Sequence, residues 1–335
     1  MRNSVLLTLS MLAVATVPLR AAQAEDFTIG GDARAFAMGG AGVATNASGG
    51  GASRNNVASL AFDKGNTRIY APNFGLRQQG AVKQDKGLDY LLGLGSLGSA
   101  AKLVRQFGTS DSTFALNASA GLRVGHLEVL TNAVGVGTVR RNGNQSDVQI
   151  NGAYALPSIG FASVIPGQKG RMKFAVGGRL KYANVVYSHL IVDSNGNASP
   201  APEMNGRETE TSQGVAADLG LMWKEDDGPL SFGIAVSNLF KPRGTNPNAS
   251  TLVTAASVGA GYVTKNATFA ADLVDITTVS GNAQFRTGAE LMVGKLPLRA
   301  GYSSATGFTY GTRLLGLDIA ISKRAPLEIG QSIRF

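Results

Sequence analysis

The sequence of 335 residues contains no cysteine and has only two histidines. The missing thiols exclude disulfide cross-links, thiol catalysis and zinc sites that depend on cysteine. With His126 and His189 as the two imidazoles, no metal site is predicted. Long hydrophobic runs are missing as well, since none reaches the roughly 18 to 20 apolar residues that a membrane-spanning helix needs.

Charge is sparse, at 16% of residues, and the formal net charge is +9. The basic residues are scattered rather than gathered in a run, so no nucleic-acid surface is predicted. His189 lies four residues before Asp193, a spacing that permits a protease-like dyad, but one nearby aspartate is commonplace. No catalytic constellation follows from the sequence, and we expect neither an enzyme nor a cofactor.

The first 24 residues have the pattern of a secretory signal peptide. Arg2 precedes a short apolar stretch from Val5 to Val17, and Ala22-Gln23-Ala24 forms a cleavage site. This order of basic start, apolar centre and small-residue site predicts export and cleavage before Glu25.

The next segment, residues 25–65, is crowded with glycine and other small residues. A phosphate-binding loop is one interpretation of such a segment, but no Lys-Ser/Thr pair follows the glycines. Small residues also allow a chain to pack tightly in a narrow space. We therefore expect an N-terminal hatch, or plug, inside a larger fold. Its candidate functional residues are Arg34, Gly39, Gly40, Asn55 and Asn56.

From about Asn66 the chain alternates between apolar and polar residues with period two, which predicts β-strands. Pro157 interrupts one strand and predicts a kink, because proline cannot donate to the ladder. About fourteen strands are expected, near 66–78, 113–125, 127–140, 148–164, 171–187, 208–224, 230–240, 251–264, 267–275, 283–294, 296–303, 307–314, 316–323 and 326–335.

The two faces of these strands differ in a way that a soluble sandwich does not explain. Leu317, Ile319 and Ile321 share one face, for example, while Asp318 lies on the other. An apolar outside and a wet inside predict an all-β fold, a transmembrane antiparallel β-barrel over 66–335 in the bacterial outer membrane. The candidate lumen-lining residues are Arg179, Asp218, Asp272, Arg286, Glu290, Arg299, Arg313 and Asp318. They either face a ligand or pair with one another and hold the hatch.

The connections alternate between short and long, as in bacterial barrels with short periplasmic turns. Residues 79–112 form the longest, a leucine-rich insertion with helical spacing. Connection 141–147 is expected to be of medium length. The C-terminal Phe335 predicts recognition by the barrel-assembly machinery, and lipid is the expected partner of the outer face.

Several phrases resemble the FadL/PorV-like superfamily of outer-membrane barrels. The stretch Ala35-Phe36-Ala37-Met38-Gly39-Gly40-Ala41-Gly42-Val43-Ala44 is followed by Asn56-Val57-Ala58-Ser59-Leu60-Ala61, and the body contains Ser231-Phe232-Gly233-Ile234-Ala235-Val236-Ser237-Asn238-Leu239. Together they are most similar to the conjugal-transfer TraF-like branch. Val57 and Ser59 replace the proline and glycine of the family's second motif, and the absence of cysteine excludes the thioredoxin-like protein that shares the TraF name.

This resemblance implies a fourteen-stranded barrel with a hatch inside it. It also implies one of two functions: passive diffusion of hydrophobic compounds, or assistance to a conjugal-transfer or secretion apparatus. A purely structural barrel is a third possibility. An apolar pocket above the hatch would favour the first function, and a filled lumen would favour the second.

Overall fold

The structure is a computed structural model of the chain. It describes residues 33–45, 55–62, 67–79, 112–154, 157–166, 171–240, 254–276, 283–304, 306–322, 327–330 and 332–334. The predicted signal peptide, nearly all of the predicted insertion 79–112 and Phe335 lie outside the described residues. The boundaries drawn from the sequence at 24 and 65 stay predictions.

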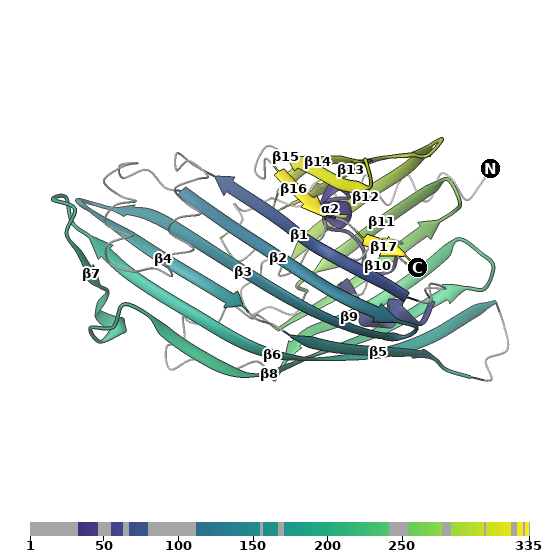
Figure 1. Cartoon of the computed structure of the whole chain (residues 1–335), viewed down its shortest axis with the longest axis horizontal. Helices are drawn as coiled ribbons and strands as arrows, with labels where there is room; N and C mark the ends of the chain where they lie inside the picture. Colours follow the sequence, from purple (N-terminus) through teal and green to yellow (C-terminus); the bar gives the residue numbers. More distant parts are fainter. Residues whose placement is uncertain are drawn as a thin grey trace.

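The described residues form short helical turns followed by strands (Figure 1). The helical turns are α2 (Ala33–Ala37), η3 (Val57–Phe62) and η4 (Pro202–Met204). The strands are β1 (Thr67–Gln79), β2 (Ser112–Val124), β3 (Leu127–Asn142), β4 (Gln145–Tyr154), β5 (Ser158–Val164), β6 (Met172–Val192), β7 (Ala198–Pro200), β8 (Glu210–Glu225), β9 (Leu230–Leu239), β10 (Ala255–Val263), β11 (Ala267–Val274), β12 (Gln284–Val293), β13 (Leu296–Ser303), β14 (Gly307–Leu314), β15 (Leu317–Ser322), β16 (Leu327–Gly330) and β17 (Ser332–Arg334). None of the described helices is long and apolar enough to cross a membrane.

All of these strands belong to one antiparallel sheet that closes on itself. β1 pairs with β2 on one side and with β16 and β17 on the other. The sheet is therefore a barrel, in which every described strand has a neighbour on both sides or continues one that does. Closure satisfies the backbone hydrogen bonds that a sheet edge would leave open.

Counted as crossings of the wall, the described strands number fourteen, as the alternation predicts. β4 and β5 both lie between β3 and β6 and form one crossing, and β16 and β17 both pair with β1. The short β7 pairs with the end of β6. The interruption between β4 and β5 falls at Pro157, so the predicted kink is confirmed.

The two ends of the barrel differ in their connections. At one end, here called the terminal end, β1 begins and β17 finishes, and short turns such as 125–126, 294–295 and 315–316 join the strands (Figure 1). The opposite, loop end carries the longer connections, including 193–209. The expected medium connection 141–147 is wrong: β3 runs to Asn142 and pairs Asn142 with Gln145, leaving a two-residue turn.

The wall is much taller on one side than on the other. β6 has 21 residues, whereas β15 has 6. At about 3.3 Å per residue and a tilt near 40°, β6 rises about 50 Å, roughly twice the apolar band of an outer-membrane barrel. The expected strand 171–187 is therefore too short, because β6 continues to Val192 by pairing with β4 and β7.

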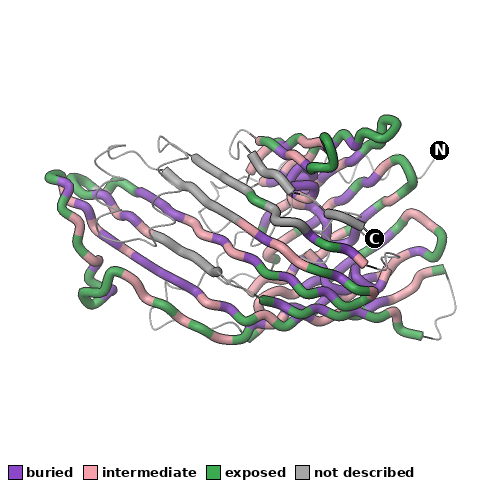
Figure 2. The backbone as a smooth tube through the Cα atoms, in the orientation of Figure 1, coloured by how far each residue is buried: buried purple, intermediate pink, exposed green. Residues whose placement is uncertain are grey.

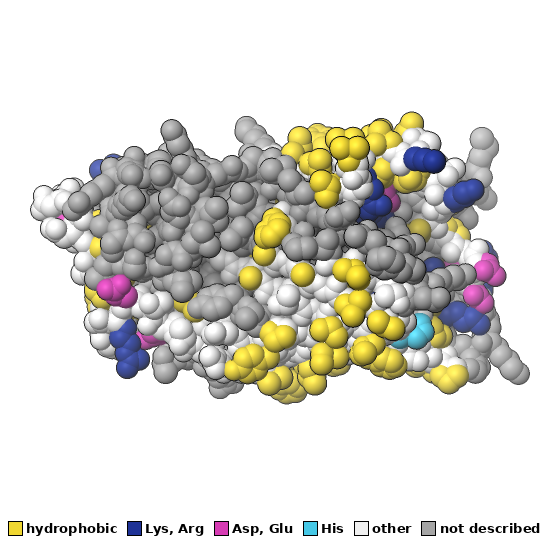
Figure 3. All heavy atoms as spheres, in the orientation of Figure 1, with side chains coloured by type: hydrophobic (Ala, Val, Ile, Leu, Met, Phe, Trp, Pro, Cys, Tyr) yellow, Lys and Arg dark blue, Asp and Glu magenta, His cyan; other side chains and the backbone are white. Residues whose placement is uncertain are grey.

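The strands alternate between an exposed apolar side and a buried side (Figure 2). Leu180 is 63% exposed and Phe308 is 65% exposed, while Arg179 and Thr309 beside them are buried. Apolar side chains gather over the ends of β2, β3 and β5 and over β13–β15, and charged ones lie toward the two ends (Figure 3). This arrangement matches a barrel wall that faces lipid.

Candidate functional site

The hatch segments 33–45 and 55–62 lie inside the barrel against opposite walls. α2 contacts β13, β14, β15 and β16, whereas η3 contacts β5, β6 and β8. Most of their described residues are buried. The two segments therefore cross the lumen near the terminal end.

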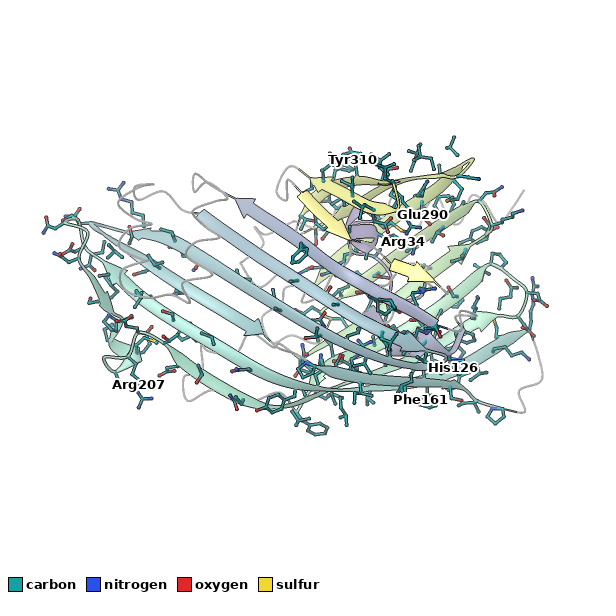
Figure 4. The ribbon with its side chains drawn as sticks, in the orientation of Figure 1. Arg34, His126, Phe161, Arg207, Glu290 and Tyr310 are labelled. Carbon is teal, nitrogen blue, oxygen red and sulfur yellow. The ribbon has the colours of Figure 1, made fainter. Side chains whose placement is uncertain are left out.

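Arg34 joins the hatch to a chain of ion pairs on the wall. Its guanidinium donates to both carboxylate oxygens of Glu290, at 2.9 and 2.7 Å, and Figure 4 shows the two side chains directed at each other. Arg299 donates to Glu290 at 2.6 Å and to Asp318 at 2.7 Å. Arg313 donates to the same Asp318. Four predicted lumen residues thus form one network with a predicted hatch residue.

Asp272 holds the hatch through its backbone. One carboxylate oxygen accepts hydrogen bonds from the N–H groups of Gly42, at 2.6 Å, and Val43, at 3.0 Å. The Asp272 side chain is buried in the wall of β11. Two donors on one buried carboxylate make this contact a strong anchor.

The two hatch segments are also tied to each other. Asn56 donates to the carbonyl oxygen of Val43, at 3.0 Å, and to that of Leu221 on β8, at 2.9 Å. Its own side-chain oxygen accepts from the N–H of Ala58. Asn55 reaches the carbonyl of Gly40 at 3.5 Å. Asn56 therefore connects both segments to the wall.

Glycines of the wall let the hatch backbone approach closely. A Cβ on Gly177 of β6 would lie 2.8 Å from the backbone nitrogen of Ala58, and those on Gly288 and Gly301 would overlap the backbone of Met38. Within the hatch, Gly39 and Gly40 adopt φ values of +69° and +78°, which favour glycine. Close backbone contacts, as well as ion pairs, therefore hold the hatch against the wall.

A second group of charged side chains, here called the floor, lies on the loop-end side of η3 and consists of Arg179, Lys181, Glu128 and Asp218. Arg179 donates to Glu128 at 2.5 Å, and Lys181 donates to Asp218 and Asn238, each at 2.5 Å. These side chains lie on neighbouring strands with little access to water. The ion pairs offset the free-energy cost of removing these charged groups from water. Glu128 was missed by sequence reasoning, although its register partner on β2 is the basic Arg123.

The remaining predicted lumen residue, Arg286, donates to Gln284 at 2.8 Å and lies against Gly40 of the hatch. The His189–Asp193 dyad considered above does not form. His189 pairs with Glu203, and Asp193 instead accepts from Asn197 in its own turn. Among the described residues, no three His, Asp or Glu side chains gather into a group that could hold a metal.

Beyond this floor the inner face becomes apolar. Val134 of β3, Ala183 and Val185 of β6 and Ala216 of β8 form a buried cluster, with Val136 packed against it. Further toward the loop end, Met204 of η4 packs on Tyr187 and Ile191 with Ala201. The buried members of both clusters are at most 6% exposed, and polar side chains share this face with them, since Gln149 of β4 and His189 of β6 are register partners whose side-chain nitrogens lie 3.4 Å apart.

The connection that carries η4 folds back onto the same inner face. Burial opposes ionisation of Glu203, but hydrogen bonds from its own N–H and from His189 outweigh it, so the pKa of Glu203 is lowered. This pair lies beside the Met204 contacts. The connection is thus held against β6 at the mouth.

The wall is interrupted next to the apolar cluster. Among the described residues, β3 pairs with β5 up to Leu130 and with β4 from Val134, and residues 155–156 between those two strands lie outside the described part. On β6 the pairing changes between Lys181 and Asn184. Exposed apolar residues such as Ile159 and Phe161 lie just toward the terminal end of the break, and Figure 4 shows Phe161 at the outside of β5. The interruption between β4 and β5, here called the break, therefore lies next to the upper edge of the apolar band, and within it the carbonyl oxygen of Pro157 accepts a hydrogen bond from the N–H of Tyr182 on β6, at 3.0 Å.

A closed fourteen-crossing wall, an apolar exterior and an internal hatch define an antiparallel β-barrel with the fold of FadL-like barrels. The chain belongs to the family described as "F plasmid transfer operon, TraF, protein", whose profile matches residues 102–274. No curated protein sequence matches this chain.

Solved structures support the same fold. The toluene transporter TbuX of Ralstonia pickettii has a TM-score of 0.54 and 13% identity, with 92% of this chain and 99% of that one covered. The CymD monoaromatic hydrocarbon channel has a TM-score of 0.53 and 13% identity, covering 91% and 97%. The toluene transporter TodX of Pseudomonas putida has a TM-score of 0.50 and 12% identity, covering 94% and 98%.

Proposed function

We propose that the chain is a passive uptake channel for small hydrophobic compounds in the bacterial outer membrane. In this proposal residues 1–24 direct export and are removed, and the terminal end faces the periplasm, where bacterial barrels have their short turns. Residues 25–65 act as the hatch. The proteins named above as transporters and channels have the same fold, which is why this function is considered first.

The observation that carries the proposal is the wall break beside the apolar cluster. The hatch and the paired charges lie toward the terminal end, whereas Val134, Ala183 and Val185 form an apolar cluster on the loop-end side of them. A hydrophobic compound that enters from the loop end gains by leaving water for this apolar surface. It then leaves sideways into lipid through the break, without crossing the hatch.

Uptake must be measured in cells, because hydrophobic molecules cross plain phospholipid vesicles without help and lipopolysaccharide is the barrier in question. Gram-negative cells producing the barrel should take up radiolabelled toluene faster than cells with an empty vector. Ala183→Phe places a ring at the inner side of the break and should reduce uptake to background. Ala300→Phe, on the lipid-facing side of β13, is the matched control and should retain uptake.

Both variants must show the heat-dependent gel mobility of a folded barrel. Uptake equal to that of the empty vector in cells that contain folded wild-type barrel would refute the channel function.

A second candidate is an outer-membrane accessory of a conjugal-transfer or secretion apparatus, with no transport of its own. The family match favours it, and so do the hydrogen bonds that fix the hatch to the wall on both sides. Cross-linking in donor cells during transfer should then recover a subunit of the apparatus with the barrel. Normal transfer after deletion of the gene would argue against this candidate.

A further inference from the structure

Two polar side chains face each other on the inner wall at the break. Ser119 of β2 and Asn132 of β3 are directly opposite in the register. They share the inward face with Arg123 and Glu128, which form the equivalent pair four residues nearer the floor. Asn132 lies on β3 between Leu130, which pairs with β5, and Val134, which pairs with β4.

Both side chains are buried, and each has an oxygen atom without a hydrogen-bond partner. Ser119 is 7% exposed and Asn132 is 8% exposed. The hydroxyl oxygen of Ser119 and the side-chain oxygen of Asn132 make no hydrogen bond. Leaving such groups unpaired in a buried place costs free energy, so a site of this kind favours a ligand or a water molecule that pairs with both.

The surroundings limit what that ligand is. Leu130 lies on the floor side of the pair and Val134 on the other, both buried, so most of the ligand must be apolar. The nearest charged pair in this register, Arg123 and Glu128, lies four residues away, and Glu128 already pairs with Arg179. An ion would bring uncompensated charge into this place.

We propose that Ser119 and Asn132 form a polar subsite for the hydroxyl group of an uncharged, otherwise apolar molecule such as a phenol. A hydroxyl both donates and accepts, so it can donate to the Asn132 oxygen and accept from the Ser119 hydroxyl. If the amide of Asn132 is turned over, its NH2 group donates to the same hydroxyl. The inference rests on the proposed channel function and adds its preferred substrate.

The test compares two probes that differ by one hydroxyl group, p-cresol and toluene, in the cellular uptake assay. The readout is the ratio of their initial uptake rates after subtraction of the empty-vector rates. A ratio measured in one batch of cells does not depend on how much folded barrel they contain. We expect Ser119→Ala and the nearly isosteric Asn132→Leu each to lower the p-cresol to toluene ratio about two- to tenfold, the usual value of one net hydrogen bond.

Thr268→Val, a buried polar residue on β11 across the barrel, is the control and should keep the wild-type ratio. If toluene enters but both subsite variants keep the wild-type ratio, the pair holds at most a water molecule, and the subsite is wrong while the channel function stands. If neither probe enters faster than in empty-vector cells, the channel function and the subsite fail together.

Discussion

Asp272 is the residue whose removal should loosen the hatch most clearly. Asp272→Ala leaves the N–H groups of Gly42 and Val43 buried without an acceptor. Each unsatisfied buried group costs about 1–3 kcal/mol. A loss of about 3 kcal/mol in the docked state raises the undocked fraction of the hatch about a hundredfold, since 1.4 kcal/mol corresponds to a factor of ten.

The chain lacks cysteine, so Val43→Cys supplies a single thiol on the hatch. Val43 is 3% exposed, and its thiol should react with a water-soluble thiol reagent only when the hatch leaves the wall. When docking is fast relative to labelling, the labelling rate follows the undocked fraction. We expect Asp272→Ala to accelerate labelling at least tenfold, and Asp272→Asn, which keeps an acceptor oxygen, to have a smaller effect.

Asp193→Ala is the control, because that carboxylate lies in an exposed turn far along the chain from the hatch contacts. Equal labelling rates for Asp272→Ala and the parent in folded barrels would refute this account of how the hatch is held.

Three further predictions follow from named contacts. Gly177→Ala forces a methyl group into the hatch backbone and should lower the thermal unfolding midpoint. The adjacent Gly178→Ala should not lower it, because no atom lies closer than 3.9 Å to the added Cβ. Equal midpoints for the two variants would argue against a tight fit of the hatch. Glu290→Leu should destabilise the barrel more than Arg34→Leu in denaturant melts, because it leaves Arg34 and another arginine buried without their carboxylate, and the reverse order would contradict the network. Because the pKa of Glu203 is lowered in the folded state, its contribution to stability is present above the ordinary glutamate pKa and is lost as the pH falls through the lowered value. Amide exchange at Ala201 and Met204, corrected for intrinsic rate, should therefore increase at that pH, and in Glu203→Gln already at pH 6.

The strands of the barrel wall could be predicted from the sequence, because the alternation of side chains that marks them is a local property. A strand that faces lipid on one side and a hydrated interior on the other must alternate, and the run from Leu317 to Ser322 places its three large apolar residues on one face. The interruption at Pro157 could be predicted in the same way, because proline has no backbone N–H to donate to a neighbouring strand. The extension of β6 beyond residue 187 was missed, because Ser188 and His189 break the alternation and are held by strand pairing instead.

Less of the candidate site could be predicted from the sequence, because its contacts join distant parts of the chain. The sequence marked Arg34 and Glu290 but did not indicate that they pair, and it gave no reason to select Glu128, Ser119 or Asn132. Their importance comes from register across β2, β3 and β6, which a single strand does not encode. The glycine contacts likewise depend on where the hatch backbone passes the wall.

Single-channel conductance in planar bilayers tests most directly whether the hatch closes the terminal end. If it does, a transported compound has to leave the barrel through the wall. The full mature chain should show no sustained ion current, whereas a barrel lacking residues 25–64 should conduct. A steady current through the full chain, or a shortened and folded barrel that stays equally closed, would contradict the account.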